Sequence, residues 1–155
     1  LRAIPVSIEN IINESVESLK SWADTKSIEL KKEIEPGLPQ ANADADRITQ
    51  VLHNLIGNAI KFTPNNGVIH VAAKSVDGPK AIQVSVRDNG IGIGKDALPK
   101  VFDKFYQVGE RVPTDITGTG IGLSIAKEIV ELHSGKIWVE SEEGQGTSFI
   151  FTIPL

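Results

Sequence analysis

Hydrophobic residues recur every three or four positions along three stretches of the chain, the spacing that forms one face of an α-helix. These stretches are residues 7–26, 44–62 and 119–133. In the second, Asp44 or Asp46 can cap the start of a helix, and Thr63 followed by Pro64 ends it. Its apolar stripe consists of Ile48, Val51, Leu52, Leu55, Ile56, Ala59 and Ile60.

Apolar and polar residues alternate in five shorter segments, which is the period of a half-buried β-strand. These segments are residues 28–34, 68–74, 81–88, 136–141 and 147–153. The turn residues Asp77, Gly78 and Pro79 favour a hairpin between the second and third segments. The pattern therefore predicts five strands.

The rest of the chain completes the expected fold. Pro5 makes residues 1–8 an edge strand or a lead-in to the first helix. Residues 89–118 contain few large apolar residues, and we expect a mobile stretch with short helical turns around residues 102–105. The order of elements predicts an α/β (α+β) sandwich, with a mixed, mostly antiparallel sheet of about five strands covered on one face by about three helices.

Composition narrows the function. The 155 residues suit one domain with one core, and 16 Lys and Arg against 20 Asp and Glu give a formal charge of −4. This balance argues against a nonspecific nucleic-acid binder and against direct membrane contact through a basic surface. The absence of cysteine excludes disulfides and thiolate metal sites. Because the sequence begins at Leu1 rather than methionine, we expect residues 1–155 to be one domain of a larger protein.

A row of polar side chains follows the helix of residues 44–62. Gln50, Asn54, Asn58 and Lys61 are separated by steps of four, four and three, so they share one face. Most such faces are simply solvated. Asparagine is a poor residue for a helix interior, however, and two of them one turn apart followed by lysine indicate a need for amide oxygens and a cation.

Asp88 ends the strand of residues 81–88 in the same phase as Ile82, Val84 and Val86, so its carboxylate is expected on the inner face. A buried carboxylate needs hydrogen-bond donors. The plain alternative is a turn, because Asp88 is followed by Asn89 and Gly90.

Eight of the 14 glycines gather in three groups. They are Gly90, Gly92, Gly94, Gly118, Gly120, Gly122, Gly144 and Gly146. The middle group opens a helix, where free backbone amides and close approach favour phosphate binding. Its spacing matches neither the dinucleotide-binding fingerprint nor the P-loop.

Taken together, these motifs resemble the catalytic, ATP-binding domain of sensor histidine kinases, which belongs to the GHKL (Bergerat-fold) superfamily. The matching segments are the N box at residues 50–59, glycine boxes at 88–93, 118–123 and 144–147, and the F box at 102–106. They occur in the order and spacing of that family. The resemblance implies a mixed-sheet sandwich with a flexible ATP lid.

The resemblance also implies a binding site for ATP and Mg²⁺. Asn58 would supply an amide oxygen to the metal ion, with Asn54 nearby and Lys61 on the phosphates, and Asp88 would accept a hydrogen bond from the adenine amino group. Gly92 would let the backbone approach the base. The other implied nucleotide-binding residues are Phe62, Gly90, Ile93, Gly118, Thr119, Gly120, Ile121, Gly122, Leu123 and Thr147.

One position departs from the family pattern. Many members carry arginine directly after the F-box aromatic pair, where this chain has Gln107. Arg111, within the implied lid of residues 109–117, is the candidate replacement for the cationic contact to the γ-phosphate. The implied catalytic set is therefore Asn54, Asn58, Lys61 and Arg111.

The phosphate acceptor implied by the family is a histidine in a separate dimerisation domain. His53, His70 and His133 lack its sequence context, and His133 at a helix C-terminus fits a helix-dipole role. We therefore expect this fragment to bind ATP without labelling itself. The implied partners are the dimerisation and phosphotransfer domain of the same protein and a response regulator receiver domain. The implied location is cytoplasmic, and a membrane-bound parent is compatible with it.

Two other functions remain open at this stage. Superfamily ATPases place a glutamate one turn before the metal-binding asparagine as general base, and here that position is Asn54, so hydrolysis is expected to be slow. A serine-phosphorylating anti-sigma kinase is a related possibility. The second open function, after the ATPase, is a nucleotide-binding regulatory module or pseudokinase, for which Gln107 is the supporting feature.

Overall fold

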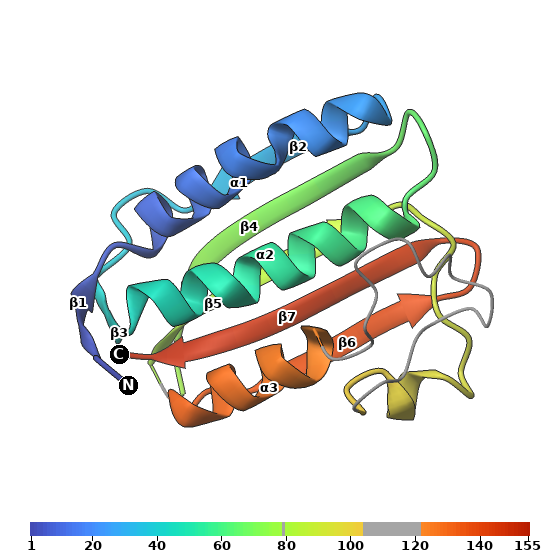
Figure 1. The fold of residues 1–155 in the computed structure, drawn as a ribbon. Coiled ribbons are helices and arrows are strands. Elements are labelled where there is room, and N and C mark those ends of the chain that lie inside the picture. Colours follow the sequence, from blue (N-terminus) through green and yellow to red (C-terminus); the bar gives the residue numbers. More distant parts are fainter. Residues whose placement is uncertain (79, 104–121) are drawn as a thin grey trace.

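The computed structural model describes residues 1–78, 80–103 and 122–155 (Figure 1). In this part of the chain the α-helices are α1 (Ile8–Thr25), α2 (Ala45–Phe62) and α3 (Gly122–Leu132), with a 3₁₀-helix, η1 (Leu98–Lys100). The strands are β1 (Ile4–Val6), β2 (Glu29–Ile34), β3 (Ala41–Ala43), β4 (Val68–Val76), β5 (Ala81–Asp88), β6 (Ile137–Glu142) and β7 (Gly146–Pro154). Figure 1 shows the three α-helices lying across one face of the sheet.

Local chemistry accounts for the ends of the two long helices. The Ser7 hydroxyl accepts the Asn10 N–H (3.2 Å) at the start of α1, and the Asp44 carboxylate accepts the Arg47 N–H (3.3 Å) at the start of α2. Each cap satisfies a backbone donor that the first turn leaves free. Pro64 follows the end of α2, as the sequence predicts.

The main sheet has the strand order β2-β4-β5-β7-β6. β2 and β4 are parallel, with α2 in the connection between them, and the other neighbours are antiparallel. The prediction of a mixed, mostly antiparallel sheet covered on one face by helices is confirmed. The register places Asp88 directly opposite Thr147, and Ser141 on the other side of Thr147.

The core lies between the helices and the inner face of this sheet. Leu52 and Ile56 of α2, Val84 of β5 and Phe151 of β7 are fully buried in one cluster. Burying each such side chain contributes about 1.5–3 kcal/mol before entropy is counted, so the apolar stripes hold the layers together. No helix in the described part of the chain has both the length and the apolar character needed to cross a bilayer.

The structure adds one short strand, β3, and one 3₁₀ turn, η1. β3 pairs with β1, which confirms the predicted edge strand near Pro5, but β3 itself was missed because Ala41–Ala43 carries no β-branched or aromatic residue. A 3₁₀ turn, η1, forms at Leu98–Lys100, where Pro99 favours the first turn. The helical turn expected around residues 102–105 lies partly outside the described residues, which end at position 103 in this segment. The predicted start of the third helix, before Gly122, lies outside the described residues.

His133 connects the end of α3 to the start of α2. Its Nε2 atom accepts the Asp44 backbone N–H (3.0 Å), and Nδ1 lies 2.9 Å from the Ile129 carbonyl oxygen. A carbonyl only accepts, so Nδ1 carries the proton and the ring is neutral. The predicted position of His133 at a helix C-terminus is confirmed, because it directly follows α3 and its ring contacts the Ile129 carbonyl. The helix-dipole role itself stays a prediction.

Candidate functional site

A mostly apolar pocket opens where α2 ends, β5 ends and α3 begins. It is lined by Asn58, Ala59, Phe62, Asp88, Ile91, Gly92, Ile93, Leu123, Thr147 and Phe149. Seven of these are residues that the sequence had singled out for nucleotide binding: Asn58, Phe62, Asp88, Gly92, Ile93, Leu123 and Thr147. The fold therefore brings together side chains from segments that are up to about 90 residues apart in sequence.

Asp88 is the buried charged group of this pocket. Only 7% of its surface is exposed, and its Oδ1 atom accepts the Gly90 N–H at 2.8 Å. Burial raises the pKa of the carboxyl group above its ordinary value, while the backbone N–H groups of Gly90 and Thr147 act in the opposite direction. The inward position predicted for Asp88 is confirmed, and the turn chemistry of Asp88–Gly90 is present in the same residues.

The loop after β5 is fastened to the turn between β6 and β7. The Gly144 N–H donates to the Ile91 carbonyl (2.8 Å), and the Ile93 N–H donates to Ser141 Oγ (2.7 Å). Gly92 has a φ of +74°, and a Cβ atom there would lie 2.2 Å from the Glu142 carbonyl oxygen. The structure thus requires glycine at position 92 for packing within the protein. The sequence also implied that Gly92 lets the backbone approach a bound base, which is a separate requirement for glycine at this position.

Ser141 is a residue of the site that the sequence alone does not indicate. Its hydroxyl also lies 2.8 Å from the Gly146 carbonyl oxygen and 2.9 Å from Thr147 Oγ1. A single serine in a strand carries no recognisable signal, and its position beside Thr147 follows only from the pairing of β6 with β7. Gly146 itself leaves no space for a side chain, because a Cβ atom there would lie 2.1 Å from the Asp88 carbonyl oxygen.

The three amide side chains on the polar face of α2 lie in three different environments. Gln50 is exposed, Asn54 donates through Nδ2 to the Gly122 carbonyl at the start of α3 (3.0 Å), and Asn58 lines the pocket. Of these three amide side chains, only Gln50 is exposed to solvent as an ordinary polar helix face would be. The amide of Asn54 fastens α3 to α2 beside the pocket.

Lys61 is not among the residues that line the pocket, although the next residue, Phe62, is. Partial burial lowers the pKa of its ammonium group, whose Nζ atom is 5.3 Å from the ring centroid of Phe62. Phe62 lines the pocket, and its carbonyl oxygen would be 2.6 Å from a Cβ atom at Gly90. Glycine at position 90 therefore allows the loop after β5 to pass the end of α2.

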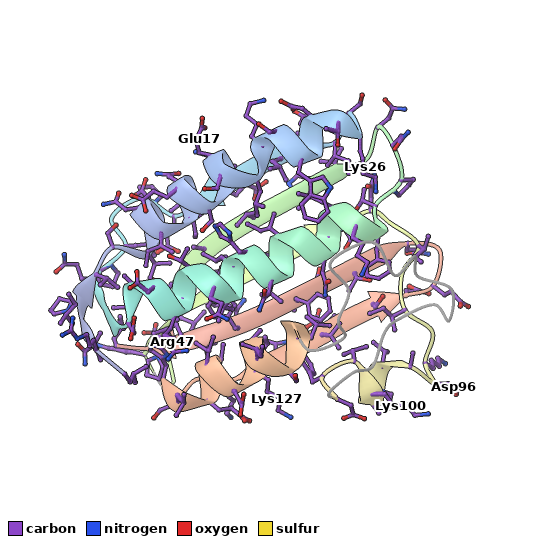
Figure 2. The ribbon with its side chains drawn as sticks, in the orientation of Figure 1. Glu17, Lys26, Arg47, Asp96, Lys100 and Lys127 are labelled. Atoms are coloured by element: carbon purple, nitrogen blue, oxygen red, sulfur yellow. The ribbon has the colours of Figure 1, made fainter. Side chains whose placement is uncertain are left out.

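Lys26 is a second residue near the site that the sequence alone does not indicate. Its Nζ atom donates to the Ile60 carbonyl (2.7 Å) and lies 3.3 Å from the Lys61 carbonyl oxygen. These are free carbonyls at the C-terminal end of α2, next to the pocket. Figure 2 shows Lys26 at the end of α1, on the side where α2 ends.

Two parts of the predicted site are only partly described. Gly118, Thr119, Gly120 and Ile121 of the second glycine box, together with Arg111 and Gln107, lie outside the described residues. In the F box, Phe102 packs edge-on against Phe149, with ring centroids 6.0 Å apart. The Nζ atom of Lys127 also lies over the Phe102 ring, 5.9 Å from its centroid. Figure 2 shows Lys127 on α3.

Comparison with known proteins places the chain in a family. Residues 43–155 match the family described as histidine kinase-, DNA gyrase B-, and HSP90-like ATPase. The sensor histidine kinase WalK of Bacillus subtilis is 46% identical over 111 residues, which are 72% of this chain and 18% of WalK. The chain spans between 18% and 39% of the length of the curated relatives it matches.

Solved structures agree with this match. The catalytic domain of the histidine kinase ThkA superposes with a TM-score of 0.85 at 33% identity, covering 99% of this chain and 96% of that one. ThkA in complex with the response regulator protein TrrA matches at a TM-score of 0.81, 30% identity, 98% of this chain and 41% of that one. Full-length ShkA in complex with AMPPNP matches at a TM-score of 0.86 and 35% identity, with 99% of this chain and 31% of ShkA covered. The chain therefore belongs to the histidine kinase-, DNA gyrase B- and HSP90-like ATPase family, and within it to the ATPase domains of sensor histidine kinases.

Proposed function

We propose that this chain is the Mg-ATP-binding catalytic domain of a two-component sensor histidine kinase. It holds ATP so that the γ-phosphoryl group passes to a histidine on the dimerisation domain of the same protein, from which a response regulator receiver domain takes it. We further propose that residues 1–155 act as one domain in the cytoplasm. The observation that carries the proposal is the buried carboxylate of Asp88 in an apolar pocket next to Asn58.

The Asp88 pocket suits the base of ATP. A buried carboxylate is costly unless donors reach it, and the exocyclic amino group of adenine is such a donor. Phe62 and Leu123 supply apolar surface for the flat faces of the ring. The AMPPNP bound in ShkA supports a nucleotide ligand for this fold.

The phosphate side of the site is built from α2. Asn58 offers a hard amide oxygen, which fits Mg²⁺, and Lys61 offers a cation. Among the described residues no group of three or more His, Cys, Asp or Glu side chains could hold a metal ion, so Asn58 fits an ion whose other ligands come from phosphates and water. When bound, Mg²⁺ neutralises charge on the phosphate oxygens.

Asn54 argues against an ATPase that activates water at this position. Its side-chain nitrogen already donates to the Gly122 carbonyl, and an amide offers no basic lone pair near neutral pH. We assign Asn54 to positioning α3 against α2. Arg111 is proposed, from sequence, as the cation at the γ-phosphate: Arg111→Ala should lower phosphoryl transfer far more than nucleotide affinity, and equal losses would contradict this role.

A calorimetric titration with AMPPNP, with and without Mg²⁺, tests the nucleotide site. Asp88→Asn should abolish binding, while Asp77→Asn, an exposed aspartate in the β4–β5 turn, should bind normally. Asn58→Ala should remove the Mg²⁺ dependence, and Gln50→Ala on the exposed part of the same helix should keep it. A folded parent chain that binds no nucleotide would overturn the proposal.

Phosphoryl transfer needs a second experiment with the dimerisation domain of the parent protein supplied in trans. Acid-labile phosphohistidine should form on that domain with ATP and disappear with Asn58→Ala. Stable phosphohistidine on the present chain alone would contradict the proposed division of labour. Nucleotide binding without any transfer would instead favour a regulatory module.

A further inference from the structure

Ser141 has three hydrogen-bond partners that use its hydroxyl group completely. The Ile93 N–H donates to Ser141 Oγ at 2.7 Å, the Gly146 carbonyl oxygen lies at 2.8 Å, and Thr147 Oγ1 lies at 2.9 Å. A serine hydroxyl has one proton and two acceptor lone pairs. The carbonyl can only accept, so the single proton of Ser141 goes to Gly146 and its two lone pairs face Ile93 and Thr147.

This assignment sets the direction of the hydroxyl of Thr147. If Ser141 donated to Thr147 instead, an oxygen lone pair would face the Gly146 carbonyl oxygen at 2.8 Å, which is a repulsive contact. Thr147 therefore donates to Ser141. Its hydroxyl proton is used inside the protein, and only acceptor lone pairs remain for the pocket that Thr147 lines.

The neighbouring polar group of the pocket is also an acceptor. Asp88 stands opposite Thr147 in the β5–β7 register, and its carboxylate accepts the Gly90 N–H. An ionised carboxylate has no proton to donate. Two acceptors thus lie side by side on the pocket wall, which suits a ligand edge that carries N–H donors and repels one that carries a carbonyl.

From this hydrogen-bond pattern we infer that Ser141 is a positioning residue for base selection: by holding the Thr147 hydroxyl as a donor to itself, it makes the pocket select a 6-amino purine over a 6-oxo purine. The inference rests on the proposed nucleotide-binding function. Ser141 does not line the pocket itself, but it contacts two residues that do, Thr147 and Ile93. Only its contact with Thr147 orients a hydroxyl group, so the base selection arises through Thr147.

Removing Ser141 frees the Thr147 hydroxyl to rotate and donate into the pocket. A 6-oxo purine then gains a partner, while a 6-amino purine loses one of two well-oriented acceptors. One such hydrogen bond corresponds to about tenfold in affinity. A purely structural role for Ser141, fastening the loop after β5 to the β6–β7 turn, would weaken both ligands equally.

The test measures the ratio of affinities for ADP and inosine diphosphate, which share the sugar and phosphates, by calorimetry. The wild-type chain should prefer ADP, and Ser141→Ala should reduce that preference by about tenfold. Ser141→Cys keeps a side chain of similar size with a poor acceptor and should act the same way, which covers the case in which Ser141→Ala fails to fold. Ser148→Ala on the adjacent strand is the matched control and should leave the ratio unchanged.

A double-mutant cycle isolates the route through Thr147. In a Thr147→Val background, Ser141→Ala should no longer change the ratio, because the hydroxyl that it orients is absent. Equal loss of affinity for both diphosphates in Ser141→Ala and Ser141→Cys would overturn the inference. Wild-type binding of ADP and inosine diphosphate with equal affinity would overturn it while the proposed function stood, and failure to bind either would refute the proposed function itself.

Discussion

Replacing Lys26 by methionine should destabilise the protein, because this side chain binds backbone carbonyls at the C-terminal end of α2. Lys26 ends α1, but its ammonium group donates to the Ile60 carbonyl at 2.7 Å and lies 3.3 Å from that of Lys61, at the end of α2. Methionine keeps the length and helix propensity of the side chain. The variant therefore removes the charged donor and leaves the two carbonyls to water.

The size of the effect follows from the contacts. A hydrogen bond with one charged partner contributes about 1.5–3 kcal/mol, and a cation at a helix C-terminus adds about 0.3–1 kcal/mol. Partial burial lowers the pKa of the Lys26 ammonium group, so its desolvation offsets part of this gain. Water can also reach the carbonyls at this partly exposed site in the variant. We therefore expect a net loss of about 1–2 kcal/mol in the free energy of unfolding. For a chain of this size that corresponds to about 2–8 °C in Tm.

Urea unfolding and thermal unfolding, followed by circular dichroism, measure this loss. Lys20→Met is the matched control, because Lys20 lies on the same helix and pairs with Asp24 at 3.2 Å while both side chains are 60% exposed. Such an exposed pair contributes about 0.3–0.5 kcal/mol. Equal unfolding midpoints for Lys26→Met and Lys20→Met would refute the reasoning, since the bonds to α2 would then contribute nothing.

Three further changes test other contacts. Gly92→Ala should lower stability by more than Gly78→Ala in urea unfolding, because both have positive φ but only at Gly92 would Cβ meet a backbone oxygen; equal losses would contradict this. Asp88→Asn should unfold at a higher urea concentration than wild type at neutral pH. Burial raises the pKa of Asp88, so the ionised carboxylate destabilises the native state of the wild type at pH values above that pKa. The difference in urea midpoint between Asp88→Asn and wild type should therefore shrink as the pH is lowered. A difference that stays constant with pH would exclude this cause. His133→Phe should cost about 1–3 kcal/mol in thermal unfolding, because the Asp44 N–H loses its acceptor, and an unchanged Tm would contradict that.

Much of the fold was readable because its signals are local. The periods of 3.6 and 2 residues report which face of an element is buried, and they identified α1, α2 and the strands of the main sheet. Asp88 could be predicted as a buried carboxylate from the phase of a single strand. β3 could not, because three small residues carry no period and their pairing with β1 depends on the distant N-terminus.

The site shows the same division. From the sequence alone came the residue types and their order: two amides and a lysine on one helix, an aspartate at a strand end, and glycines in loops. The tertiary structure alone decided which atoms meet. It brought the Lys26 ammonium group to the Ile60 carbonyl near the end of α2, packed Gly92 against the backbone of Glu142, and brought the Ser141 hydroxyl beside that of Thr147. The physical reason is that each of these contacts joins elements packed by the whole core, and a hydrogen bond needs positions correct within a fraction of an ångström, which no local pattern specifies.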